Sequence, residues 1–239
     1  KRVRVKLNME MNMQNRFNIL GLTLVILLAS CSSSEDEQIQ EELSSSGSTE
    51  IGLIDDERIL AAETEPGNWL AHGRTYEERR FSPLNNINKE NVSELGLVWS
   101  KDMGTNRALE ATPIVVDGIM FFTSTWSRVY AVDALTGETI WKFDPKVPGE
   151  WARKACCDIV NRGVAVYNGK VYSASLDGRL FAINAETGEL VWEVDTIIDR
   201  TRSYTITGAP RVAKGKVYIG NGGAEYGVRG YVTAYDTES

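Results

Sequence analysis

Short runs of alternating apolar and polar residues, separated by turn residues, fill the chain from residue 114 onward. The segments 114–122 (IVVDGIMFF), 164–175 (VAVYNGKVYSAS) and 211–220 (RVAKGKVYIG) each place an x-Gly dipeptide between two such runs. Residues 175–184 (SLDGRLFAIN) contain a further Asp-Gly. An x-Gly dipeptide in this setting is typical of a tight β-hairpin turn. The pattern therefore predicts a succession of short antiparallel strands.

The chain also repeats itself with a period of about fifty residues. The segment 131–141 (AVDALTGETIW) returns at 182–192 (AINAETGELVW), 51 positions later, and 234–239 (AYDTES) begins a third copy. In both complete copies an Asp or Asn precedes a Thr-Gly turn, where its side chain can bond the turn backbone and the Gly can adopt a positive φ. Each complete copy ends in a Trp, Trp141 or Trp192, whose large apolar surface suits packing between neighbouring units.

Four antiparallel strands in about fifty residues are typical of one blade of a β-propeller. A single blade cannot bury both of its faces, so several blades must stack in a ring. We therefore expect an all-β fold of four-stranded antiparallel blades with Trp-docking repeats, of which this chain covers roughly the first two to three. Residues 95–102 (LGLVWSKD) are expected to form an additional opening strand.

The N-terminal part has the pattern of an export signal. Arg16 is followed by an apolar run from Ile19 to Ala29, and its eleven residues are too few to cross a bilayer core of about 30 Å. That length fits the apolar region of a signal peptide. Residues 28–31 (LASC) resemble the lipobox of bacterial lipoproteins, which implies cleavage before Cys31 and lipidation of that residue. A plain secretory signal with an incidental Cys is the alternative.

These features predict three parts of the chain: a signal peptide over 1–30 with an uncertain start residue, a lipidated Cys31 with a Ser- and Glu-rich tether over 31–60, and the folded part over 61–239. Ser32 resembles the outer-membrane form of the sorting signal. We therefore expect a bacterial protein that a lipid anchor holds in the periplasm, at the outer membrane. An exported protein can form disulfides.

The net charge and the ends of the chain give further expectations about its partners and its extent. The 239 residues carry a net charge of −7 and an isoelectric point near 5.0, so nucleic acid is not an expected partner. Because the chain starts at Lys1 and its third repeat stops at Ser239, we expect the N-terminal part of a longer protein. The single histidine, His72, is expected to be structural, and Asp55-Asp56 are expected to be solvated.

Four further motifs are more specific. Residues 110–113 (EATP), 143–163 (FDPKVPGEWARKACCDIVNRG), 205–210 (TITGAP) and 221–236 (NGGAEYGVRGYVTAYD) follow one another along the chain. Their order resembles the quinoprotein alcohol dehydrogenases, and the resemblance extends from Trp69 to Ser239. It implies an eight-bladed propeller that holds pyrroloquinoline quinone (PQQ) and a divalent cation.

Cys156 and Cys157 are adjacent, although the chain has only three Cys residues. Neighbouring Cα atoms lie about 3.8 Å apart, which is less than the roughly 5.5–6 Å of an ordinary disulfide. A bond between the two would close a small strained ring. The resemblance implies that this vicinal disulfide forms one face of the PQQ site. A pair of buried free thiols is the alternative.

The resemblance also assigns polar groups to the cofactor. Arg162 matches an Arg at the rim of the quinone, where a guanidinium offers a fixed fork of donors. Glu110 and Thr207 match side chains that bond the cofactor, and Gly223 and Ala224 match backbone donors to one of its carboxylates. A surface ion pair or a solvated strand end is the ordinary alternative for the side chains.

One residue matches a ligand of the cation. Glu225 corresponds to a carboxylate ligand of calcium or, in some relatives, of a lanthanide. Calcium takes six to eight oxygen ligands, so further ligands are expected beyond Ser239, together with the Asp that acts as general base. No catalytic residue is therefore assigned within this chain. Gly222 stands where some relatives carry Ser, so one side-chain contact to the cofactor is expected to be missing.

The implied activity is the oxidation of primary alcohols to aldehydes. In the family the cation polarises a quinone carbonyl, an Asp takes the hydroxyl proton and hydride passes to the quinone. Electrons then leave to a cytochrome c or another periplasmic acceptor. The motifs look closest to the quinohaemoprotein branch, which implies a haem c on a C-terminal domain, and this chain alone is expected to be inactive. Two alternatives stay open: a non-enzymatic propeller lipoprotein that acts as an outer-membrane assembly scaffold, and a degenerate quinoprotein that only binds a ligand.

Overall fold

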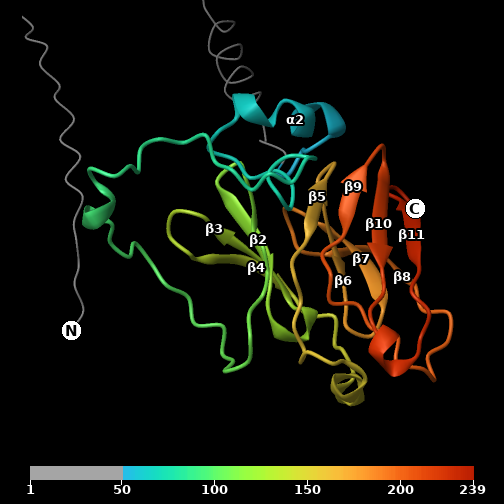
Figure 1. Cartoon of the computed structure of the whole chain (residues 1–239). Coiled ribbons are helices and arrows are strands. Elements are labelled where there is room, and N and C mark those ends of the chain that lie inside the picture. Colours follow the sequence, from blue (N-terminus) through green and yellow to red (C-terminus); the bar gives the residue numbers. More distant parts are fainter. Residues whose placement is uncertain (1–50) are drawn as a thin grey trace, which may run out of the picture. The chain divides into compact units, whose positions relative to one another are not determined.

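The computed structural model describes residues 51–239; the predicted signal peptide and Cys31 lie outside the described residues. The strands form three antiparallel sheets (Figure 1). The first contains β1 (Ile114–Val116), β2 (Ile119–Thr123), β3 (Val129–Asp133) and β4 (Thr139–Phe143). The second contains β5 (Ala165–Tyr167), β6 (Lys170–Ala174), β7 (Arg179–Asn184) and β8 (Leu190–Asp195). The third contains β9 (Arg211–Ala213), β10 (Lys216–Gly220) and β11 (Val232–Asp236). The prediction of antiparallel sheets with four strands is thus confirmed for the two complete repeats.

The predicted hairpins open each sheet. They join β1 to β2, β5 to β6 and β9 to β10. Each turn consists of two residues with positive φ: Asp117-Gly118, Asn168-Gly169 and Lys214-Gly215. Two successive left-handed residues give a turn whose twist matches that of the flanking strands, and this explains why an x-Gly dipeptide marks all three turns.

The repeated Asp/Asn-x-x-Thr-Gly turn forms as predicted. Asp133 Oδ1 accepts hydrogen bonds from the backbone N–H groups two and three positions later, at 2.9 and 2.7 Å. Asn184 Oδ1 accepts the equivalent pair, both at 2.9 Å. Gly137 and Gly188 then take φ values of 73° and 76°, which a side chain would disfavour. Both copies also contain a shift of strand register at the same place, so the repeat extends to the details of the backbone.

The core lies between the sheets. In the second sheet, β6 and β7 are buried at nearly every position, because they have a sheet on either side, whereas the outermost strand β8 is largely exposed. Indole groups join each sheet to the next: Trp141 Nε1 donates to the carbonyl of Ala185 at 2.8 Å, and Trp192 Nε1 donates to the carbonyl of Thr237 at 3.4 Å.

Short helices occupy the connections and the segment before β1. They are α2 (Asp56–Leu60), η1 (Ala62–Thr64), η2 (Val92–Glu94), η3 (Thr125–Ser127), η4 (Gly149–Lys154) and η5 (Ala224–Tyr226). No helix among residues 51–239 is long and apolar enough to cross a membrane.

Residues 51–60 differ from the predicted tether. They form a turn and the helix α2, and Ile54 and Ile59 are fully buried in the main core. The folded part therefore includes residues before the expected boundary at residue 61. The physical reason is that apolar side chains return at Ile51, so this segment can bury surface that the Ser- and Glu-rich stretch before it cannot.

Asp55 and Asp56, which were expected to be solvated, also form hydrogen bonds that the sequence did not indicate. Asp55 is exposed, but it caps α2, since its Oδ1 accepts a hydrogen bond from the N–H of Arg58 at 2.7 Å. Asp56 accepts bonds from the hydroxyl of Tyr76 at 2.5 Å and from the N–H of Lys214 at 2.9 Å. Burial opposes ionisation of Asp56, but these hydrogen bonds outweigh it and hold the pKa of the carboxyl below its usual value.

The opening strand expected over 95–102 does not form. Leu97 and Val98 are about four-fifths exposed, and no strand of the described part pairs with this segment. A strand needs a partner for its backbone groups, and alternation alone does not supply one. Trp99 still packs on Gly137, and its Nε1 donates to a backbone carbonyl as the other repeat indoles do.

Candidate functional site

Every predicted site residue of the described part lies in a connection at one end of the sheets. Glu110 precedes β1, residues 156–162 lie between β4 and β5, Thr207 lies between β8 and β9, and residues 223–225 lie between β10 and β11. The tight hairpin turns and α2 lie at the opposite end (Figure 1). Loops that a rigid scaffold positions commonly carry binding residues, so the end with the long connections is the candidate site.

Arg162 joins two of the other predicted residues. Its Nη2 lies 2.8 Å from Oε2 of Glu110, and its Nη1 donates to Oγ1 of Thr207 at 2.5 Å. The Arg162 and Glu110 side chains are 41% and 37% exposed, so a ligand can reach them. A guanidinium has five N–H donors, and this one can therefore bind an anionic oxygen in addition to its present partners.

Main-chain hydrogen bonds place these three segments side by side. The N–H of Thr112 donates to the carbonyl of Arg162 at 3.1 Å, and the N–H of Arg162 donates to the carbonyl of Thr207 at 2.9 Å. Gly163 has φ 124°, and a Cβ there would lie 2.7 Å from the carbonyl oxygen of Thr112. The close approach of the segments therefore depends on glycine at this position.

A disulfide joins Cys156 and Cys157, whose Cα atoms are 3.8 Å apart. Both residues are exposed. Their loop rests on a small apolar cluster of the buried side chains Trp151, Ile159 and Leu176, which we call the satellite core. Bonded and exposed sulfurs do not match the alternative of buried free thiols. A pair of polarisable sulfurs on a supported loop can instead present a flat apolar face to a ligand.

The segment before η5 approaches another loop closely. Gly223 has φ 105°, and a Cβ there would overlap the carbonyl oxygen of Ser203. Gly222 is different, because a Cβ there would be 3.6 Å from the nearest atoms of Thr205, an ordinary contact. A Ser at Gly222 would therefore fit this backbone, and Gly223 is the position that needs glycine. Residues 224–225 are exposed at the site end.

Glu225 stands apart from the contacts described above. Within residues 51–239 no hydrogen bond or ion pair links it to another predicted site residue. The same range contains no group of three or more His, Cys, Asp or Glu side chains that could hold a metal ion. Because calcium needs six to eight oxygen ligands, Glu225 can contribute only one part of a cation site.

An ion pair beside the disulfide was not expected from the sequence. Arg107 pairs with Asp158, the residue that follows Cys157. Trp126 was not expected either; it has a left-handed backbone with φ 62°, and its N–H donates to the carbonyl of Ile159 at 3.1 Å. The signal that could have revealed the ion pair is its spacing of 51 residues, which equals the repeat period.

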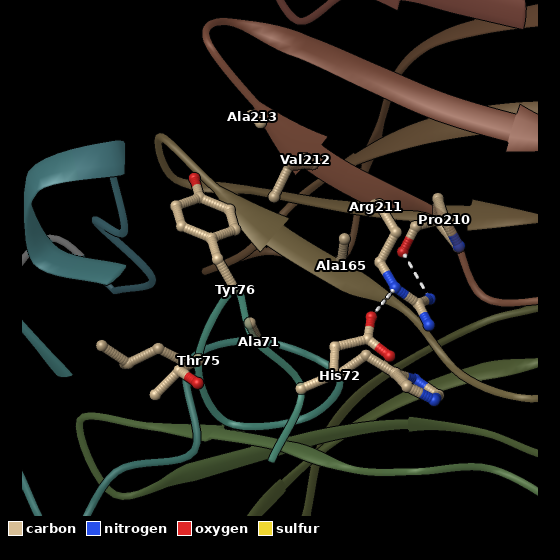
Figure 2. A pocket seen from close by; sticks show the side chains of 11 residues that line it. Ala71, His72, Thr75, Tyr76, Ala165, Pro210, Arg211, Val212 and Ala213 are labelled. Atoms are coloured by element: carbon tan, nitrogen blue, oxygen red, sulfur yellow. Dashed lines mark hydrogen bonds and ion pairs between the residues drawn. The ribbon is translucent and has the colours of Figure 1, made fainter. Parts of the chain in front are cut away.

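A separate cavity of about 210 Å³ lies against β5 and β9. Figure 2 shows His72, Tyr76 and Arg211 around it. Glu78 pairs with Arg211 at 2.5 Å, and this bond lowers the pKa of Glu78. Burial, together with the positive charge of Arg211, lowers the pKa of His72, and Nδ1 of His72 is buried without a hydrogen-bond partner. The cavity therefore favours a neutral imidazole beside an ion pair.

Comparison with known proteins identifies the class. The family model described as "PQQ: Glucose/ethanol/alcohol dehydrogenase, beta-propeller domain" matches residues 69–239. This range includes all three sheets and every candidate cofactor residue named above. The chain belongs to this family of PQQ-binding β-propeller proteins.

Individual relatives agree with the family. The chain is 61% identical over 186 residues to quinohemoprotein alcohol dehydrogenase ADH-IIG of Pseudomonas putida, covering 78% of this chain and 26% of the relative. It is 60% identical over 170 residues to the 1-butanol dehydrogenase (cytochrome c) of Thauera butanivorans, covering 71% and 25%. The chain thus spans about a quarter of the length of the curated relatives it matches.

Solved structures show the same fold. The structure of ADHIIG from Pseudomonas putida HK5 superposes with a TM-score of 0.78 over 79% of this chain and 28% of that chain, at 61% identity. A europium-containing methanol dehydrogenase superposes with a TM-score of 0.72 over 76% of this chain and 32% of that chain, at 41% identity. All these relatives are dehydrogenases, and they give no support to the alternative of a non-enzymatic scaffold.

Proposed function

We propose that the protein to which this chain belongs oxidises primary alcohols to aldehydes with PQQ as its cofactor. The observation that carries the proposal is the cluster of Arg162, Glu110 and Thr207, which lies at the same end of the sheets as the Cys156–Cys157 disulfide. Family membership and the dehydrogenases named above support it.

The residues present suit a planar tricarboxylate such as PQQ. Arg162 would bind an oxygen at the rim, with Glu110 and Thr207 fixing the guanidinium on two sides. The disulfide would cover one face of the ring system, and the backbone at Gly223 and Ala224 would donate to a carboxylate. The chemistry that PQQ supplies when bound is the two-electron oxidation of an alcohol.

The cation belongs to the same proposal. Glu225 would provide one ligand to calcium or to a lanthanide, and the other ligands would come from residues outside this chain. The similarity to a europium-containing methanol dehydrogenase supports keeping a lanthanide in the proposal. The general base, the remaining blades of an eight-bladed ring and a haem c domain are likewise proposed to lie outside this chain. An electron acceptor of the cytochrome c class is supported by the name of the 1-butanol dehydrogenase (cytochrome c).

We also propose that the mature protein is anchored by a lipid on Cys31 and faces the periplasm at the outer membrane. The support is the LASC motif behind an apolar run of signal-peptide length. Labelling cells with radioactive palmitate tests it. The wild-type protein should incorporate label and Cys31→Ser should not, whereas equal labelling, or none in either, would argue for a plain secretory signal.

The activity is tested on the full-length protein, purified without cofactor and reconstituted with PQQ and either calcium or a lanthanide. The readout is oxidation of 1-butanol coupled to an artificial electron-accepting dye. Arg162→Gln should weaken PQQ binding by at least about tenfold, because it removes a charged hydrogen bond worth about 1.5–3 kcal/mol. Glu225→Ala should lose activity that excess cation partly restores.

Two results would contradict the proposal. A wild-type protein that takes up no PQQ with either cation would leave only the ligand-binding alternative. Normal cation dependence in Glu225→Ala would remove that residue from the metal site.

A further inference from the structure

A second ion pair joins the same two segments that Glu110 and Arg162 connect. Arg107, three residues before Glu110, pairs with Asp158, the residue after Cys157. The partners of the two pairs are 51 and 52 positions apart, close to the period of the repeat. The positively charged side chain belongs to the first segment in the Arg107–Asp158 pair and to the second segment in the Glu110–Arg162 pair. Charge is balanced within each pair, and together the pairs connect the segments at two points.

Asp158 controls how the chain leaves the disulfide. Its φ of 71° lies in the left-handed region, which residues other than glycine seldom occupy, although Asp tolerates it better than most. On one side of Asp158 is the exposed Cys157, and on the other is Ile159, which is buried in the satellite core. Two contacts therefore hold the loop: Ile159 packs in the satellite core, and Asp158 pairs with Arg107 at the surface.

The Glu110–Arg162 pair has a second task besides joining the segments, because its guanidinium is also the group that would bind an anionic oxygen of the ligand. The Arg107–Asp158 pair shares no atom with that guanidinium, so it keeps the segments joined whatever Arg162 binds. The two ion pairs thus have different tasks: one is available to the ligand, and the other maintains the frame.

We propose that Arg107 and Asp158 are positioning residues that hold the Cys156–Cys157 disulfide in place for the cofactor, a role that rests on the proposed function. Their side chains are 56% and 32% exposed. An ion pair so exposed adds little to global stability, so its loss is expected to change the site while the fold remains.

The first experiment titrates the full-length, cofactor-free protein with PQQ in the presence of calcium and follows the quinone absorbance. Arg107→Gln and Asp158→Asn should each weaken binding by about tenfold, the usual lower range for losing a group that orients a ligand-binding one. Arg107→Lys keeps the charge and should bind almost as the wild type does. Lys216→Gln is the matched control, because it breaks an exposed ion pair with Asp236 at the opposite end of the sheets. Wild-type affinity in both Arg107→Gln and Asp158→Asn would overturn the proposal.

The second experiment needs no cofactor and therefore separates this inference from the proposed function. It measures how fast dithiothreitol reduces the disulfide, with peptide mapping of alkylated Cys156 and Cys157. Electrostatics alone predicts that Arg107→Gln slows attack by an anionic thiolate, since it removes a nearby positive charge. The positioning role predicts the opposite, because a loosened loop exposes the bond. Faster reduction in both Arg107→Gln and Asp158→Asn supports the proposal, and a rate in Arg107→Gln at or below that of the wild type refutes it. If the wild type binds no PQQ, the proposed function fails and this rate still decides the inference.

Discussion

The indole of Trp141 lies directly over the backbone of Gly188 in the neighbouring repeat, so that a Cβ on Gly188 would be 2.7 Å from Cδ2 of the ring. The same indole donates its N–H to the carbonyl of Ala185 at 2.8 Å. Trp99 and Gly137 repeat the arrangement one sheet earlier, with the nearest ring carbon 2.5 Å from the hypothetical Cβ. The Gly of the Thr-Gly turn is thus also the surface on which the indole of the preceding Trp packs.

This double role predicts a strong effect of Gly188→Ala. The positive φ alone costs about 1–2 kcal/mol for an Ala, and the overlap with Trp141 adds about 1–3 kcal/mol. Gly118→Ala is the matched control, because Gly118 has a φ of 79° but no atom lies within 4 Å of the point that a Cβ would occupy. Urea unfolding of the full-length protein measures both. Equal losses in the two variants would show that the contact with Trp141 contributes nothing.

Alanine substitutions at Gly222 and Gly223 test which of these two positions at the candidate site requires glycine. Gly223→Ala should destabilise the loop and abolish high-affinity PQQ binding, because its Cβ meets the carbonyl of Ser203. Gly222→Ala should bind PQQ within about threefold of the wild type, since its Cβ makes only an ordinary contact. Titration with PQQ checks both, and tolerance of Ala at Gly223 would contradict the structure of this loop.

The disulfide is expected to serve the site more than the fold. Cys156→Ser opens a ring between adjacent residues, which restrains the unfolded chain very little. The thermal midpoint should therefore stay within about 2 °C of the wild type, a shift that corresponds to less than about 1 kcal/mol. Dye-linked alcohol oxidation should fall by at least about tenfold, while Cys31→Ser leaves it unchanged in the detergent-purified protein. Full activity of Cys156→Ser would remove the disulfide from the cofactor site.

The lowered pKa of His72 predicts a pH dependence of stability. Its pKa in the folded protein lies below the ordinary value of 6.5, so the unfolded chain takes up the proton first as the pH falls. The stability that neutral His72 contributes is complete above about pH 6.5 and is lost as the pH falls below that value. The thermal midpoint should thus drop between pH 7.5 and 5.5, and His72→Gln should drop less. If the thermal midpoints of the wild type and His72→Gln depended on pH in the same way, the pKa of His72 would not be lowered by folding.

The lowered pKa of Glu78 predicts a loss of stability in a different, more acidic pH range. The hydrogen bond from Arg211 lowers the pKa of Glu78, so the stability from this pair is present above the ordinary value of 4.5 and is lost only as the pH falls below it. Glu78→Gln should therefore change the acid limb of the stability curve below pH 4.5. The fall between pH 7.5 and 5.5 should remain, because the charge of Glu78 raises the pKa of His72 and its removal lowers that pKa further. If Glu78→Gln changed the curve only between pH 5.5 and 7.5, Glu78 and not His72 would be the group that titrates in that range.

The sequence alone determined the repeating part of this protein. Hairpins form where x-Gly dipeptides interrupt alternating runs, and Asp133 and Asn184 bond the turns that their motif predicts, because these signals act within a few residues. The choice of Glu110, Arg162 and Thr207 also came from the sequence, through motifs that resemble one family. Their presence at one end of the sheets follows from the strand order once the hairpins are known.

Only the tertiary structure decided which groups touch. The ion pair of Arg107 with Asp158, the contact of Trp141 with Gly188 and the hydrogen bonds that hold Asp56 all join residues at least 20 positions apart. The strand expected over 95–102 failed for the same reason, since alternation creates an apolar face but cannot supply the partner that pairs with it. Local pattern fixes backbone conformation within a turn or strand, whereas burial, strain and charge pairing depend on the neighbours that folding brings together.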